Sequence, residues 1–130
     1  MSITARLLMS LFQEYSPLND TDMKVDQSLI EKMLQLYGQD PQLLMVVEES
    51  LELALSVVKF LRKTANAVPG KHVDKETLIK NMVEEAADVS IVLKNIPTLF
   101  GEDNVQAEID RKVARQWKRV ENFKPDAGAS

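Results

Sequence analysis

The sequence QLLMVVEESLELALSVVK, residues 42–59, decides how this chain folds. On a helix of about 3.6 residues per turn, Glu49 and Glu52 project from the same face. Apolar residues flank this pair on the remaining circumference, namely Leu43, Val46, Val47, Leu51, Leu55 and Val58. The stretch therefore predicts a long helix that carries acidic side chains within a wide apolar surface.

A second stretch, EEAADVSIVL at residues 84–93, repeats this arrangement. Glu85 and Asp88 share one helical face, with Val89 and Val92 among their apolar neighbours. We expect the two helices to pack together through their apolar residues, which brings the four acidic side chains close. Carboxylates crowded in a partly dry site repel one another unless protons or cations neutralise them. The simplest neutraliser is a divalent metal ion.

The remaining sequence predicts an all-α fold of about five helices with a four-helix-bundle-like core, because no stretch alternates with the period of a strand. The expected helices span residues 3–15, 26–37, 41–65, 75–95 and 104–122. Gly38 is suited to end the second helix, with Asp40 as the N-cap of the third and Pro41 as its first residue. Asp74 should cap the fourth helix after the break NAVPGKHVD, residues 66–74.

Composition limits the class of protein. With 130 residues, 45% of them hydrophobic, the chain forms one domain. A net charge of −4 argues against a general nucleic-acid binder. The absence of cysteine excludes disulfides and thiolate zinc sites and suits a cytoplasmic protein. No apolar run approaches 18 residues and the start lacks a small-residue cleavage site, so we expect neither a membrane span nor a signal peptide.

The two acidic motifs read E-E-x-x-E at residues 48–52 and E-x-x-D at residues 85–88. In this respect the chain resembles the all-α nucleoside triphosphate pyrophosphohydrolases of the MazG-like superfamily. The resemblance also includes Gly38, Gln42, Lys59 and a basic C-terminal helix. The resemblance covers about residues 26–122, within an expected family-like domain of residues 21–123. An extra N-terminal helix in residues 1–20 departs from the family pattern, and residues 124–130 are expected to form a flexible tail. The interval between the motifs, residues 53–84, is longer than is usual for the family.

The resemblance implies a metal site and a reaction. The expected ligands of Mg²⁺, with Mn²⁺ as an alternative, are Glu49, Glu52, Glu85 and Asp88. The expected reaction is hydrolysis of a nucleoside or deoxynucleoside triphosphate between its α- and β-phosphates, giving the monophosphate and pyrophosphate. Glu48 or Glu49 would accept the proton of the attacking water. The candidate phosphate-binding residues are Lys59, Asn81, Lys112, Arg115 and Arg119.

Several of these positions also have plainer interpretations. Lys59 could simply extend from its helix into solvent, and the basic residues of the last helix could form an ordinary solvated face. His72 is expected in an exposed loop rather than as a catalytic base. Trp117 is expected in a core or dimer contact with Val113 and Val120 rather than stacked on a nucleobase.

Three functions remain open on the sequence alone. The first is the pyrophosphohydrolase, which the resemblance implies would work as a homodimer or homotetramer. The wide apolar surface of residues 43–61 agrees with such an assembly. The second is a phosphoribosyl-ATP hydrolase or a dUTP- or dCTP-type hydrolase of the same superfamily. The third is a helical interaction module without catalytic activity.

Overall fold

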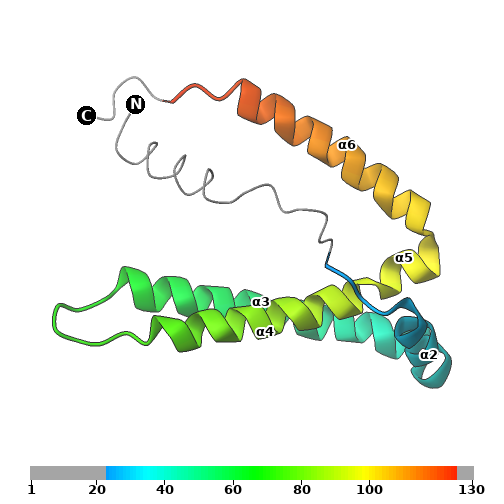
Figure 1. Cartoon of the computed structure of the whole chain (residues 1–130), viewed down its shortest axis with the longest axis horizontal. Coiled ribbons are helices and arrows are strands. Elements are labelled where there is room, and N and C mark those ends of the chain that lie inside the picture. The colour runs from blue at the N-terminus through cyan, green and yellow to red at the C-terminus, as the bar shows by residue number, and fades with distance from the viewer. Residues whose placement is uncertain (1–22, 126–130) are drawn as a thin grey trace.

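The computed structural model describes residues 23–125, which form helices and no strand (Figure 1). Four longer helices and one short helix follow one another: α2 (Gln27–Tyr37), α3 (Gln39–Ala65), α4 (Lys75–Leu93), α5 (Asn95–Phe100) and α6 (Glu102–Glu121). The prediction of an all-α fold is confirmed for this part of the chain. The helix expected over residues 3–15 lies outside the described residues.

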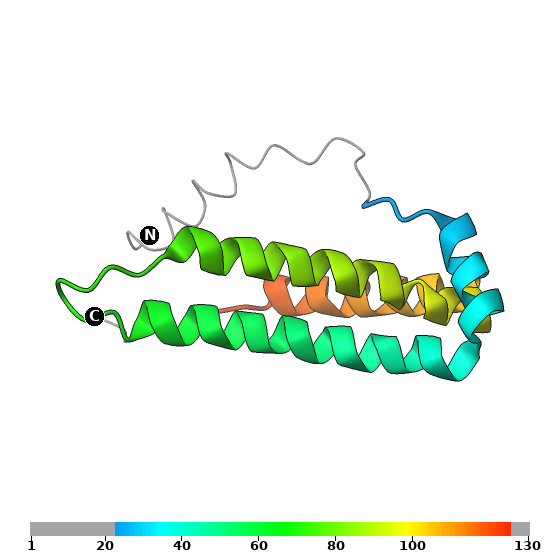
Figure 2. The same cartoon turned by 90° about the horizontal axis from the view of Figure 1, so that it is seen from below.

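Helices α3 and α4 run side by side as an antiparallel hairpin (Figures 1 and 2). α3 ends at Ala65, as predicted, and the chain returns through residues 66–74. Asp74 caps α4, because its carboxylate accepts hydrogen bonds from the Thr77 backbone N–H at 3.0 Å and the Thr77 hydroxyl at 2.7 Å. The predicted cap is therefore confirmed. Within the described residues α3 and α4 pair with each other, whereas α6 packs along neither of them, so a four-helix bundle would need a second hairpin.

The predicted start of α3 is wrong. Asp40 is not its N-cap, because the helix already begins at Gln39 and Gly38 serves as both the C-cap of α2 and the N-cap of α3. Gly38 has φ 87° and ψ 171°, a conformation that needs no Cβ and lets one residue join two helices. Pro41 consequently lies in the first turn rather than at its first position. Its missing N–H costs nothing there, since the first four helical N–H groups have no partner within the helix.

The region after α4 also differs from prediction. α4 ends at Leu93, not near residue 95, and Lys94 leads directly into the short α5. Gly101, with φ 106°, then turns the chain into α6, which begins at Glu102 rather than residue 104. Glu102 and Asp103 in the first turn suit the positive end of the helix dipole.

The hairpin seam combines apolar residues with two of the acidic residues that were expected to come together. Shielded side chains recur every three or four residues along both helices, among them Gln42, Met45, Glu49, Leu53, Ser56 and Phe60 on α3, and Leu78, Met82, Glu85, Val89 and Val92 on α4. Four of the apolar residues expected to pack this pair, Val47, Leu51, Leu55 and Val58, are instead 46–65% exposed. Glu49 and Glu85 thus occupy seam positions, and part of the apolar surface of α3 faces outward.

α6 contacts α5 and turns away from the hairpin (Figure 1). Four of its apolar side chains are exposed and form one stripe, the α6 stripe: Ile109, Val113, Trp117 and Val120. Trp117 is 62% exposed, so it is not part of the core formed by the described residues. Among residues 23–125, no helix combines the length and the apolar composition that a membrane crossing requires.

Candidate metal centre

Three carboxylates from two helices converge at the middle of the hairpin. Glu49 of α3 and Glu85 and Asp88 of α4 each offer one oxygen atom, and these three atoms lie within 4.8 Å of one another. Glu49 and Glu85 are half-buried and Asp88 is exposed. We call these three residues the acidic cluster. It joins three of the four metal ligands that the sequence motifs predicted.

One oxygen of the acidic cluster lacks any hydrogen-bond partner. Glu85 Oε2 is buried and unpaired. Burying a carboxylate oxygen without a hydrogen-bond donor or a cation costs free energy of folding, and native structures rarely contain such an oxygen. Oxygens that share one Mg²⁺ at about 2.1 Å lie roughly 3–4 Å apart, so small side-chain rotations would bring the three carboxylates around an ion. The donor set is all oxygen, which suits Mg²⁺ or Mn²⁺.

The carboxylates of the acidic cluster and of Glu52 repel one another. The pKa of Glu49 is raised above its ordinary value by loss of hydration, then by the charges of Glu52, Asp88 and Glu85. The pKa of Glu85 is raised by loss of hydration, then by Glu52 and Asp88. Glu52 therefore acts on both partners although it is not one of the three converging residues. A divalent cation at this position would remove the repulsion.

These raised pKa values predict a pH-dependent difference in stability. The native state binds protons at Glu49 and Glu85 more tightly than the unfolded chain does. The protonated side chains therefore favour the folded state below the ordinary pKa of 4.5, and this contribution to stability is lost as the pH rises through the raised pKa values of the folded state. In EDTA, the melting temperature of the Glu49→Gln/Glu85→Gln variant minus that of the wild type should therefore increase as the pH is raised from 4 to 7. Thermal melts at each pH measure this difference, and a difference that stays constant over the range contradicts it.

The other predicted site residues lie at different distances from the acidic cluster. Glu48 is exposed and lies outside it, next to Glu49 in the chain. Lys59 and Asn81 line a pocket further along the hairpin. The predicted phosphate-binding residues of the last helix are exposed on α6, which turns away from the hairpin of the same chain: Lys112, Arg115 and Arg119.

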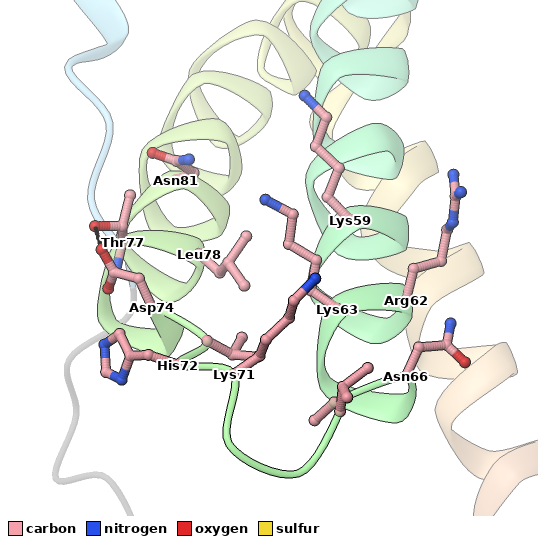
Figure 3. A pocket seen from close by; sticks show the side chains of 13 residues that line it. Lys59, Arg62, Lys63, Asn66, Lys71, His72, Asp74, Thr77, Leu78 and Asn81 are labelled. Atoms are coloured by element: carbon pink, nitrogen blue, oxygen red, sulfur yellow. Dashed lines mark hydrogen bonds between the residues drawn. The ribbon is translucent and has the colours of Figure 1, made fainter.

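The pocket at the loop end of the hairpin has a volume of about 960 Å³. Its positively charged lining residues come from α3 and the loop, and we call it the basic pocket: Lys59, Arg62, Lys63 and Lys71 (Figure 3). Sequence reasoning singled out Lys59 and Asn81 but missed the other three cations. The spacing of Lys59 and Lys63, one helical turn apart, was an available signal. His72 is exposed in the loop, as predicted, and also lines this pocket.

Comparison of the chain with models of protein families, with curated proteins and with solved structures returns no significant match.

Proposed function

We propose that this protein is a magnesium-dependent hydrolase that cleaves nucleoside or deoxynucleoside triphosphates between the α- and β-phosphates. The single observation that carries the proposal is the convergence of Glu49, Glu85 and Asp88, together with a buried oxygen of Glu85, Oε2, that has no hydrogen-bond partner. The E-E-x-x-E and E-x-x-D motifs and their resemblance to MazG-like enzymes support it. The proposed setting is the cytoplasm, where such an enzyme would adjust the nucleotide pool or remove non-standard nucleotides.

The roles follow from position and charge. Glu49, Glu85 and Asp88 hold the cation, with Glu52 beside them as the fourth predicted ligand. When bound, Mg²⁺ supplies a Lewis acid for the phosphate oxygens and lowers the pKa of a coordinated water. Glu48, exposed and next to the cluster in sequence, or Glu49 itself accepts the water proton. Lys59, about 10 Å along the helix axis from Glu52, lies on the side to which the phosphates would extend.

The active form in this proposal is a homodimer or a homotetramer with a MazG-type bundle. Within residues 23–125, the buried apolar residues are Ile30, Leu78 and Val92, which is a small core for so hydrophobic a chain. The exposed apolar residues of this part of the chain are spread over α2, α3, α4 and α6, a wide surface that a second copy of the chain could cover. A second copy offers matching surface, with the α6 stripe packed on the outer face of the partner hairpin.

This assembly would also give the basic residues of α6 a function. Lys112, Arg115 and Arg119 are exposed on a helix that leaves its own hairpin. Packing of α6 on a second hairpin would carry their positive charge toward the acidic cluster of the partner subunit. There they would meet the charge that develops on the departing pyrophosphate.

Turnover of a nucleotide panel tests the proposed reaction. Purified protein is incubated with each common ribo- and deoxynucleoside triphosphate in Mg²⁺ or in EDTA, and products are followed by ³¹P NMR. We expect monophosphate and pyrophosphate from at least one nucleotide in Mg²⁺, and none in EDTA. Release of inorganic phosphate and a nucleoside diphosphate instead would show cleavage between the β- and γ-phosphates and would contradict the proposed reaction.

The panel also separates the alternatives. Exclusive turnover of phosphoribosyl-ATP, dUTP or dCTP would assign the chain to the related hydrolases with the same metal site. Absence of turnover on every substrate, together with a melting temperature unaffected by Mg²⁺, would favour the interaction module without catalysis.

A further inference from the structure

The basic pocket concentrates positive charge in an otherwise acidic chain. Four cationic residues line it, and Asp74 is its one acidic lining residue, whereas the whole chain carries a net charge of −4. The carboxylate of Asp74 is already engaged by Thr77 as the cap of α4. The charge of the pocket is therefore only partly compensated from within it.

The cations of the pocket form no ion pair in the described part of the chain. The salt bridges of residues 23–125 are Lys80 with Glu84 at 3.9 Å and Arg111 with Glu108 at 2.7 Å. A chain with 20 acidic residues offers many partners, yet Lys59, Lys63 and Lys71 lie within 4.0 Å of none among the described residues. Like charges left unpaired around one hollow favour an anion that they can share.

The direction of the side chains supports a shared ligand. Side chains of a helix lean toward its N-terminus, which for α3 is the direction of the acidic cluster. Lys63 extends into the space between the two helices, Lys71 reaches toward it from the loop, and Asn81 lines the same pocket from α4 (Figure 3). Arg62 lies on the outer side of α3. Lys63 and Lys71 are thus the cations best placed to hold one anion together with Lys59.

We propose that the basic pocket is a binding site for a phosphate chain, of pyrophosphate or triphosphate size, that does not depend on the metal. Lysine ammonium groups bind phosphate oxygens as point charges, and the Asn81 amide adds a neutral donor. Lys63 lies about 16 Å along the helix axis from Glu52, so the pocket reaches well beyond the acidic cluster. The open volume of about 960 Å³ leaves ample room for a chain of several phosphates.

Calorimetric titration with tripolyphosphate in EDTA tests this proposal. The wild type should bind, and Lys63→Gln/Lys71→Gln should bind at least about tenfold more weakly, because two of the three cations that face the hollow are lost. The matched control is Lys24→Gln/Lys32→Gln, which removes the same charge from exposed positions at the other end of the hairpin. Both pairs are exposed, and a melt by circular dichroism checks that each variant folds.

Two results would overturn the proposal: no binding of tripolyphosphate by the wild type, or equal weakening in the control pair. The Glu85→Gln variant separates this site from the proposed function. It should bind tripolyphosphate in EDTA as the wild type does, even if it has no turnover. Loss of binding in Glu85→Gln would contradict a site independent of the acidic cluster.

The phosphate chain could belong to a nucleotide held at the metal or to a free polyphosphate. Repeating the titration in Mg²⁺ with a non-hydrolysable nucleoside triphosphate already bound distinguishes them. If the nucleotide abolishes tripolyphosphate binding, its own phosphate tail occupies the pocket. If both bind together, the pocket holds a separate polyphosphate.

Discussion

Replacement of Glu85 by glutamine is expected to lower the turnover of the best nucleotide substrate by about a hundredfold or more, since a metal centre contributes several kcal/mol to such a reaction. Glutamine keeps the size of the side chain but removes a negative charge from the acidic cluster. In EDTA the same change relieves repulsion with Glu52 and Asp88, so the melting temperature should rise while activity falls. Loss of activity through unfolding would lower both.

The matched control is Glu84→Gln, one residue away. Glu84 is exposed and pairs with Lys80 at 3.9 Å on the solvent side of α4. An exposed pair of this kind contributes little, so turnover and melting temperature should both stay close to the wild type. If Glu84→Gln reduced turnover as much as Glu85→Gln, the activity would depend on the total negative charge of α4 rather than on the acidic cluster.

The variant Val113→Asp/Val120→Asp should convert the proposed dimer into single chains at micromolar concentration. Both valines lie on the α6 stripe and are 49% and 64% exposed in one chain, so the substitutions should leave the fold of that chain intact. In a symmetric assembly each change counts twice, and burying an apolar side chain contributes about 1.5–3 kcal/mol. The dissociation constant should therefore rise by at least about a thousandfold.

Light scattering during gel filtration measures the mass directly. The measured mass of the wild type should be at least twice the 14.7 kDa of one chain, and the measured mass of the variant should equal that of one chain. Ala107→Asp/Ala114→Asp introduces the same charges at the same spacing outside the α6 stripe and should keep the assembly intact. A wild type that elutes as one chain would contradict the dimer, and a mass reduced only after removal of residues 1–22 would assign the contact to that segment.

Sequence periodicity predicted which residues share a helical face but not which face meets a neighbour. α3 is apolar around most of its circumference, so Leu51 and Leu55 were as plausible at the seam as Leu53. The structure places Glu49 and Glu85 there and leaves Leu51 and Leu55 more than half exposed. The pairing of the two acidic motifs could be predicted because one hairpin connects them.

Features that depend on single backbone angles or on the loop were beyond pattern reasoning. The positive φ of Gly38 moved the start of α3, and that of Gly101 helps to set the direction of α6. The basic pocket forms only when Lys71 of the loop folds back beside Lys63. Asp74 was different, since its cap is a local interaction with Thr77 that the sequence encodes directly.

The acidic cluster as a cation site is tested most directly by titrating Mn²⁺ into metal-free protein and following free ion by electron paramagnetic resonance. Mn²⁺ accepts the same oxygen ligands as Mg²⁺ and is directly observable. The wild type should bind Mn²⁺, and Glu49→Gln/Glu85→Gln should lose that binding, while Glu84→Gln retains it. Equal binding of Mn²⁺ by the wild type and the double variant would contradict a metal centre between α3 and α4.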